Sequence, residues 1–285
     1  LKKRYKLISV VGLGNAASSI AELFSSTPEY NVYQLASKIK RGKNKKVLKD
    51  FRSPEEYEKN VPNLKNFFKD IDDEVQFFIV GSSMSSNYAL GVLEQIKNKN
   101  INLFYIKPDT DLLAGIPKLV ERAAFGVLQE YARSGLFKSM TIISNENIEK
   151  ILGNVPIKNY YNTLNETIFS TVHYMNYFEH NEPELGVQTA PPDICRIKSL
   201  GALDMESLEE KWFFNLDSPR DLCYYLNINQ RRLENDGTLH KKYVDILKQK
   251  PRNVFRNISY SIYETELESD FGFCVAHTNA IQENT

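Results

Sequence analysis

Glycine is scarce in this sequence. Only 13 of the 285 residues are glycine, about 4.6% where roughly 7% is usual. Nucleotide-binding α/β proteins place glycine in the loops that hold phosphate, so the shortage counts mildly against an ordinary member of that class. Net charge is also lacking, because 36 Lys and Arg balance 36 Asp and Glu. A protein that coats nucleic acid needs an excess of positive charge, so we expect no direct nucleic-acid binding.

Cysteine and long apolar runs are equally limited. Cys195, Cys223 and Cys274 are widely spaced and form no CxxC or Cys/His pattern, which argues against a structural zinc site. We expect three reduced, buried thiols in a cytoplasmic protein. No apolar run approaches the roughly 18 residues that a membrane-spanning helix needs, so we expect no membrane span.

Strands alternate with helices in the first part of the chain. Apolar runs predict strands over residues 7–11, 30–36, 75–80, 101–106 and 140–143. Helical spacing predicts helices over residues 16–24, 64–71, 88–97 and 119–133. This alternation favours a Rossmann-like, mostly parallel sheet with helices on both faces. We therefore expect an α/β domain of the nucleotide-binding type over residues 1–158.

The pattern changes after a long predicted helix. Apolar positions at helical spacing predict a central helix over residues 159–180. Beyond it we expect a smaller α+β domain with a mixed sheet over residues 181–285. Its strands are predicted over residues 211–216, 255–263 and 271–278, and its helices over residues 194–203, 219–232 and 238–249.

Two polar turns follow predicted strands of the first domain. Gly12-Leu13-Gly14-Asn15 precedes the first helix, and the serine-rich turn Gly81 to Asn87 precedes the helix over residues 88–97. In a parallel sheet both turns lie at one edge, where backbone N–H groups and helix N-termini attract anions. A polar turn that only caps a helix remains an alternative for the second turn.

The first turn also fits a loose dinucleotide-binding pattern. Gly12-x-Gly14-x-x-Ala17 has the required spacing. However, Leu35-Ala36-Ser37-Lys38 stands where an acidic residue should hold the ribose, which would require a phosphorylated ribose. An NADP-dependent oxidoreductase is therefore a less favoured alternative.

At these turns the chain resembles the tubulin/FtsZ family, best over residues 5–205. The segment over residues 8–19 looks like the family's first loop, with Ser18 and Ser19 where two asparagines would stand. Gly81 to Asn87 falls where the family carries GGGTGTG and keeps its length of seven, but only Gly81 remains glycine. Arg122 resembles the arginine of a helix near the phosphate site.

The resemblance implies a GTP or GDP site, with Mg²⁺ as a further cofactor. The implied phosphate-site residues are Gly12, Gly14, Asn15, Ser18, Ser19, Gly81, Ser82, Ser83, Ser85, Ser86, Asn87 and Arg122. The family's base pocket corresponds to Asn145, which would read the guanine edge, and to Tyr161 and Asn165, which would stack on and bond the base. An Asn amide offers one donor and one acceptor for a base edge. Tyr161 and Asn165 are four apart and share a helix face. Taken separately, Asn145 could instead cap a helix and Tyr161 could belong to the core.

Two departures from the family pattern bear on function. Side chains replace four glycines of the signature loop, and each Cβ restricts positive φ and crowds a phosphate. The family's loop that reaches the next subunit's nucleotide corresponds here to residues 189–196, whose one acid, Asp193, is the candidate catalytic residue. The family has two acids there. Since phosphoryl transfer depends on positioning and charge stabilisation, we expect reduced or altered hydrolysis.

The favoured hypothesis is a divergent tubulin/FtsZ-like cytoskeletal protein, of a phage or plasmid type. It would assemble with itself head to tail, because a heterologous contact that does not close gives an open filament. An adaptor protein is a further expected partner. A basic run over residues 38–49 and an acidic stretch over residues 264–270 are two surfaces that could meet between subunits. The alternative is a non-catalytic structural or interaction protein on the same fold with a degenerate nucleotide site.

Overall fold

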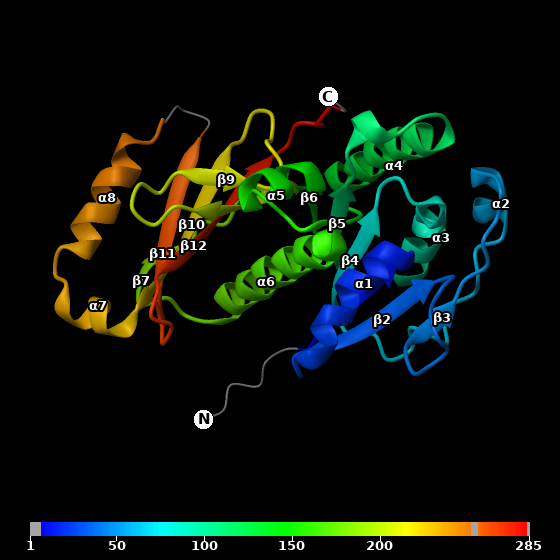
Figure 1. Ribbon diagram of the computed structural model, residues 1–285, viewed down its shortest axis with the longest axis horizontal. Coiled ribbons are helices and arrows are strands. Elements are labelled where there is room, and N and C mark those ends of the chain that lie inside the picture. The colour runs from blue at the N-terminus through cyan, green and yellow to red at the C-terminus, as the bar shows by residue number, and fades with distance from the viewer. Residues whose placement is uncertain (1–6, 252–255, 284–285) are drawn as a thin grey trace. The chain divides into compact units, whose positions relative to one another are not determined.

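The computed structural model describes residues 7–251 and 256–283 and divides the chain into two compact units (Figure 1). Unit 1 contains Leu1–Phe169 and Ile281–Thr285, and unit 2 contains Ser170–Ala280. The boundary falls within the long helix α6 (Tyr160–His180), which the sequence predicts over residues 159–180. The domain boundaries expected at residues 158 and 180 stay predictions, because the units describe packing and not independent folding.

Unit 1 contains a run of six parallel strands. Their spatial order is β3 (Lys45–Val47), β2 (Tyr30–Ala36), β1 (Ile8–Leu13), β4 (Glu74–Val80), β5 (Asn100–Lys107) and β6 (Ser139–Ser144). The helices of this unit are α1 (Asn15–Leu23), α2 (Pro54–Lys59), α3 (Ala89–Leu93), α4 (Ile116–Arg133), α5 (Asn145–Leu152) and the first part of α6. All of β1 is buried, as expected of a parallel strand covered on both faces. The predicted α/β class with a mostly parallel sheet is confirmed.

Apolar spacing explains how the first helix packs. Ala17, Ile20 and Ala21 are buried in α1, which packs against β1, β2 and β4. These positions are three to four residues apart and so lie on one helix face. α1 is thereby held with its N-terminus at the carboxyl end of β1, which is where the first polar turn lies.

Unit 2 contains a mixed sheet, as the sequence predicts. Its spatial order is β8 (Ile197–Leu203), β12 (Phe271–Thr278), β10 (Asp221–Asn229), β11 (Asn257–Thr265) and β7 (Leu185–Val187), and β9 (Glu210–Trp212) pairs with β8. The β10–β11 pair is parallel, and the other pairs of this sheet are antiparallel. Two helices, α7 (Gln230–Asn235) and α8 (Leu239–Gln249), connect β10 to β11.

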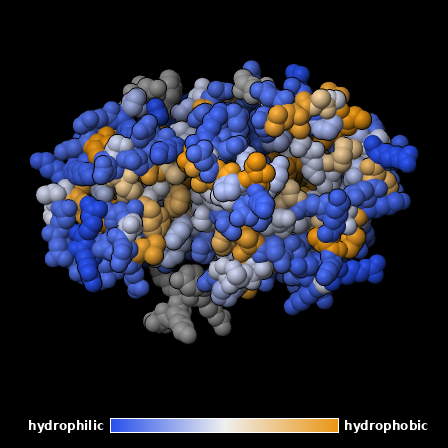
Figure 2. Space-filling model, viewed as in Figure 1, coloured by the Kyte–Doolittle hydropathy of each residue, from blue (hydrophilic) through white to orange (hydrophobic). Residues whose placement is uncertain are grey.

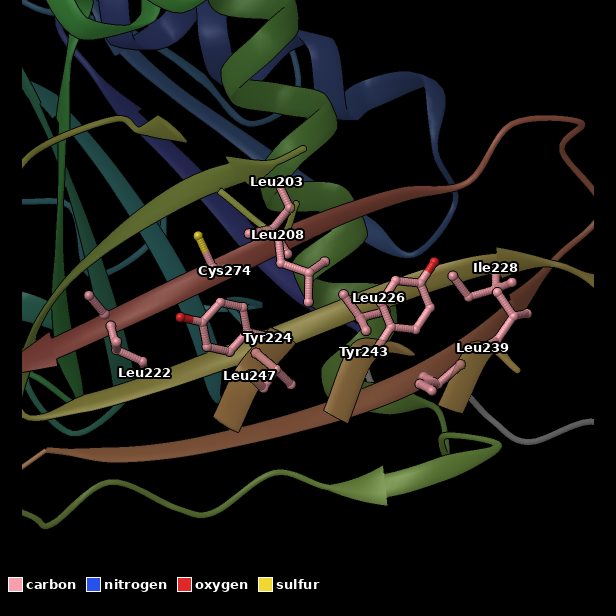
Figure 3. Packing of buried hydrophobic residues seen from close by; sticks show 12 residues of the cluster. Leu203, Leu208, Leu222, Tyr224, Leu226, Ile228, Leu239, Tyr243, Leu247 and Cys274 are labelled. Atoms are coloured by element: carbon pink, nitrogen blue, oxygen red, sulfur yellow. The ribbon is translucent and has the colours of Figure 1, made fainter. Parts of the chain in front are cut away.

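One hydrophobic cluster holds α8 against this sheet (Figure 3). Leu239, Tyr243 and Leu247 are four residues apart, so they form one buried face of α8. They pack with side chains of β10, namely Leu222, Tyr224, Leu226 and Ile228. Alternate residues of a strand point to the same face, which explains the spacing of two along β10.

Three predicted helices are wrong. Residues 197–203 form β8 and residues 221–229 form β10, where helices were predicted over 194–203 and 219–232. β10 is buried along almost its whole length, so its sequence lacks the alternation that marks a half-buried strand. In β8, Gly201 packs against Trp212 and the sulfur of Cys274, a close approach that a sheet provides. Residues 65–70 form turns where a helix was predicted over 64–71, with one helix-like bond from the Phe68 amide to the Leu64 carbonyl at 2.9 Å.

The remaining elements lie within a few residues of their predicted bounds, and β2 and β12 match them. The predicted start of one strand, Phe255, lies outside the described residues. In the part of the chain that the structure describes, no helix has the length and apolarity needed to span a membrane.

Candidate functional site

The first polar turn joins β1 to α1 and needs both of its glycines. Gly14 is the N-cap of α1 and has a φ of +92°, a conformation that residues with a Cβ rarely adopt. A Cβ at Gly12 would lie 2.6 Å from the Ala17 carbonyl oxygen, so glycine lets α1 pack against the end of β1. Within the described chain, no side chain caps the first turn of α1. The first N–H groups of this helix therefore remain available to an anion.

Three predicted side chains of this turn are engaged locally. The Ser18 hydroxyl donates to the Gly12 carbonyl at 3.1 Å and is buried, and the Ser19 hydroxyl donates to the Asn15 carbonyl at 3.1 Å. Asn15 accepts from the Lys38 amide at 2.9 Å and donates to the Ser37 hydroxyl at 3.3 Å. Asn15 thus ties the turn to the segment after β2, and these side chains shape the turn.

The second polar turn folds into a 3-10 helix over Met84–Tyr88. The Ser83 and Ser85 hydroxyls share a hydrogen bond of 2.7 Å, and the Asn87 amide donates to the Met84 carbonyl at 2.8 Å. Across the described chain, the residues with positive φ include none from 81 to 87. The limit that these side chains place on positive φ is therefore not violated in this turn, because a backbone with negative φ suits L-residues.

The structure brings the two turns into contact. A Cβ at Gly14 would lie 2.6 Å from the Ser85 hydroxyl oxygen and 3.1 Å from that of Ser83. An anion at the N-terminus of α1 would therefore meet two hydroxyl groups, each of which can donate one hydrogen bond. Ser82 is half-buried beside them. Ser86 is buried, and its hydroxyl has no hydrogen-bond partner among the described residues.

A buried charged pair lies under the start of the second turn. Gly81 is close to the hydroxyl of Tyr105 on β5, and this hydroxyl lies 3.3 Å from the carboxylate of Glu121 on α4. The Lys107 ammonium is 3.7 Å from the same carboxylate. Burial raises the pKa of Glu121 and lowers that of Lys107, while the attraction within the pair opposes both shifts. The next residue of α4, Arg122, is exposed.

The predicted base-site residues lie on α5 and α6. Asn145 is the half-buried first residue of α5, directly after β6, while the N-cap is Ser144, whose hydroxyl accepts from the Asn147 amide at 3.3 Å. The alternative that Asn145 caps the helix is therefore wrong. Tyr161 is 69% exposed, so it is not a core residue. Asn165 is half-buried one turn further along the same face of α6.

A neighbouring tyrosine links α6 to α5. The Tyr160 hydroxyl donates to the Glu149 carboxylate at 2.7 Å. Burial, followed by this bond, raises the pKa of Tyr160 to about 12. The start of α6 is thus fixed to the helix that begins with Asn145.

The candidate acid Asp193 belongs to unit 2, where it is exposed in a turn before β8. The loop that carries it is anchored by Gln188, a residue that the sequence reasoning missed. The Gln188 amide nitrogen donates to the Ser261 hydroxyl at 2.6 Å and to the Tyr224 carbonyl at 3.0 Å. Its amide oxygen accepts from the Ser259 hydroxyl at 3.0 Å. Only the position of a polar residue next to the loop could have signalled this role.

The described residues offer no ready-made site for a metal ion. No three His, Cys, Asp or Glu side chains gather there in a way that would hold a metal ion. The cysteines are free and buried.

Comparison with known proteins identifies the fold. No protein-family model matches this sequence, and no curated protein matches it. A TubZ protofilament of Bacillus thuringiensis serovar israelensis in its GTPγS form matches with a TM-score of 0.73 at 13% identity, over 96% of this chain and 87% of TubZ. An FtsZ dimer of M. jannaschii matches with a TM-score of 0.66 at 14% identity, over 97% of this chain and 89% of FtsZ. The GDP-bound CetZ1 monomer of Haloferax volcanii matches with a TM-score of 0.67 at 11% identity, over 96% and 94% of the two chains. This chain therefore has the fold of the tubulin/FtsZ family, at a low sequence identity to these structures.

Proposed function

We propose that this protein is a cytoplasmic, tubulin/FtsZ-like cytoskeletal protein that binds GTP or GDP and assembles head to tail with itself. The observation that carries the proposal is the meeting of two polar turns, where the Ser83 and Ser85 hydroxyls lie against Gly14 at the N-terminus of α1. Helix N-termini bind phosphate through free N–H groups and the helix dipole. The fold likeness to proteins named with GTPγS and GDP supports the same assignment.

The residues present fit the phosphates of such a nucleotide. The first turn of α1 supplies N–H donors, and the serines of the second turn supply hydroxyl donors in addition to their backbone N–H groups. Exposed Arg122 on α4 would add positive charge. Because the described residues offer no set of three metal ligands, Mg²⁺ would be held mainly by phosphate oxygens and water.

The base end fits guanine. Tyr161 is 69% exposed, so its ring can stack on a base and need not first move out of the hydrophobic core. Asn145 and Asn165 offer amides, each with a donor and an acceptor for the base edge. Their half-buried positions limit their motion and so favour one orientation.

Exposed apolar side chains support self-association. Leu112, Ile116 and Ile157, which follow the carboxyl ends of β5 and β6 in the chain, are 82%, 53% and 93% exposed. Figure 2 shows hydrophobic side chains gathered over α4, where Leu119 is also exposed. Large exposed apolar patches mark interaction sites. In an assembly, Asp193 of one subunit would face the nucleotide of the next, and one acid there would give slow hydrolysis.

The test combines a GTP titration with electron microscopy. Wild-type protein should bind GTP and form filaments. Replacing Tyr161 by Ala should weaken binding roughly 5- to 150-fold, since stacking on an aromatic ring contributes about 1–3 kcal/mol per base. The melting temperature should stay unchanged, because Tyr161 is mostly exposed. Tyr177→Ala is the matched control, since this tyrosine lies near the other end of α6 and is 40% exposed. If the protein neither binds GTP nor forms filaments, the proposal is wrong.

One observation favours the alternative of a structural protein with a degenerate site. The Ser83 and Ser85 hydroxyls bond one another and occupy the space against Gly14. A phosphate must rearrange them before it can approach the turn. Filaments or a stable complex formed equally well without nucleotide would favour this alternative.

A further inference from the structure

Three polar side chains are buried together beneath the second turn. Tyr105 and Lys107 come from β5 and are 0% and 5% exposed, and Glu121 comes from α4 and is 1% exposed. The Glu121 carboxylate lies 3.3 Å from the Tyr105 hydroxyl and 3.7 Å from the Lys107 ammonium. The ammonium also lies 4.7 Å from the centre of the Phe125 ring. The cluster therefore joins the end of β5 to α4.

The same cluster explains why Gly81 is still glycine. A Cβ at Gly81 would overlap the Tyr105 hydroxyl and would lie 2.6 Å from the ring carbon that carries it. Gly81 does not have a positive φ, so its backbone conformation does not require glycine. Glycine is required because Tyr105 leaves no space for a Cβ. The Gly81 amide also donates to the Ile106 carbonyl at 3.0 Å. The first residue of the turn therefore rests directly on Tyr105.

The other end of the cluster sets the rotation of α4. Glu121 and Phe125 are four residues apart, so they lie on one helix face, and both contact Lys107. With this face turned inward, the neighbouring Arg122 is turned outward. Any rotation of α4 that moved Arg122 would break the pair between Lys107 and Glu121.

A buried ion pair is seldom more stabilising than apolar residues of the same volume. Such a pair suits a role in which geometry matters more than stability. We propose that Tyr105, Lys107 and Glu121 are positioning residues, which hold the Gly81–Asn87 turn and the Arg122 helix in one arrangement for binding phosphate. This inference rests on the proposed function, because the phosphate belongs to the proposed GTP site.

The test compares variants that each change a single chemical group. Tyr105→Phe removes only the hydroxyl, and Gly81→Ala adds the Cβ that would overlap it. Gly126→Ala is the matched control for the second change, because no atom lies within 4 Å of a Cβ at that position of α4. Tyr243→Phe, in the core of unit 2, is the control for the first. GTP affinity, melting temperature and hydrogen exchange of the amides of residues 82–88 without nucleotide are measured for each.

Tyr105→Phe should weaken GTP binding about three- to ten-fold, and Gly81→Ala should weaken it more. Both should speed the exchange of residues 82–88, since exchange reports local opening, while the two controls leave affinity and exchange unchanged. If the three residues had a purely structural role, both variants would have a lower melting temperature but wild-type GTP affinity and wild-type exchange of residues 82–88. That result would overturn the inference. If wild-type protein binds no GTP, the proposed function fails. The exchange of residues 82–88 then decides by itself whether Tyr105 holds the turn.

Discussion

Replacing Ser83 and Ser85 together by alanine tests whether their hydroxyl groups donate to phosphate, because alanine removes the hydroxyls and keeps the backbone N–H groups. The two hydroxyls carry two protons, and their mutual bond of 2.7 Å uses one of them. One proton is therefore left for a phosphate oxygen. A hydrogen bond to a charged group contributes about 1.5–3 kcal/mol, so the double alanine variant should bind GTP roughly 10- to 150-fold more weakly. Each single variant should lose less, because the remaining hydroxyl can still donate.

Titration calorimetry with GTP measures this loss, and Ser134→Ala, at the C-terminal end of α4 and outside both turns, is the control. The glycine variants Ser83→Gly and Ser85→Gly make the experiment decisive. They also remove the hydroxyls, so the double glycine variant should bind as weakly as the double alanine variant. Tighter binding than in wild type would refute the reasoning, since it would mean that the side chains obstruct the phosphate and do not donate to it.

Three further predictions concern stability and assembly. Leu226→Ala should lower the free energy of unfolding by about 2–5 kcal/mol in urea titrations, because Leu226 is fully buried in the cluster under α8. Burial lowers the pKa of His277 to about 3 from an ordinary 6.5, so the folded protein keeps this ring neutral. Its contribution to stability is complete above pH 6.5 and falls below it by at most about 1.4 kcal/mol per pH unit, which urea unfolding from pH 7 to 5 would measure. Filaments counted by electron microscopy should be lost as salt rises towards about 0.5 M, if the basic run over residues 38–49 and the acidic stretch over residues 264–270 meet between subunits.

Each of these has a control. Leu267→Ala, at a site 51% exposed, should change the unfolding free energy by less than about 0.5 kcal/mol. In the variant His277→Phe, the loss of stability between pH 6.5 and 5 should shrink, and an unchanged slope would contradict the assignment to this ring. Filaments that persist unchanged at high salt would rule out a charged contact between subunits.

The fold of unit 1 could be predicted because its strands are short apolar runs separated by polar turns. The bounds of β2 follow directly from this contrast in the sequence. Unit 2 was harder to predict, since β10 is buried on both faces and carries an unbroken run of five apolar residues from Leu222 to Leu226. Such a run has no period of two, and its length allowed a helix instead.

The candidate site, too, could be predicted from the sequence only in part. The order of the turns along the chain was enough to place Gly12, Gly81 and Asn145 at the ends of strands, because parallel strands share one carboxyl edge. The sequence could not tell that the second turn forms a 3-10 helix, nor that Tyr105 lies under Gly81. Both depend on packing between segments that are far apart in the chain, and local residue patterns carry no information about it.

The anchor of the Asp193 loop has a consequence for how subunits would separate and rejoin. Gln188 holds this loop through bonds between neutral groups, to Ser259, Ser261 and the Tyr224 carbonyl. Added salt screens charges and leaves such bonds largely intact. If the protein assembles through this loop as proposed, subunits released by salt would keep the loop in shape. Filament growth should then resume, once the salt is diluted, without a slow refolding phase.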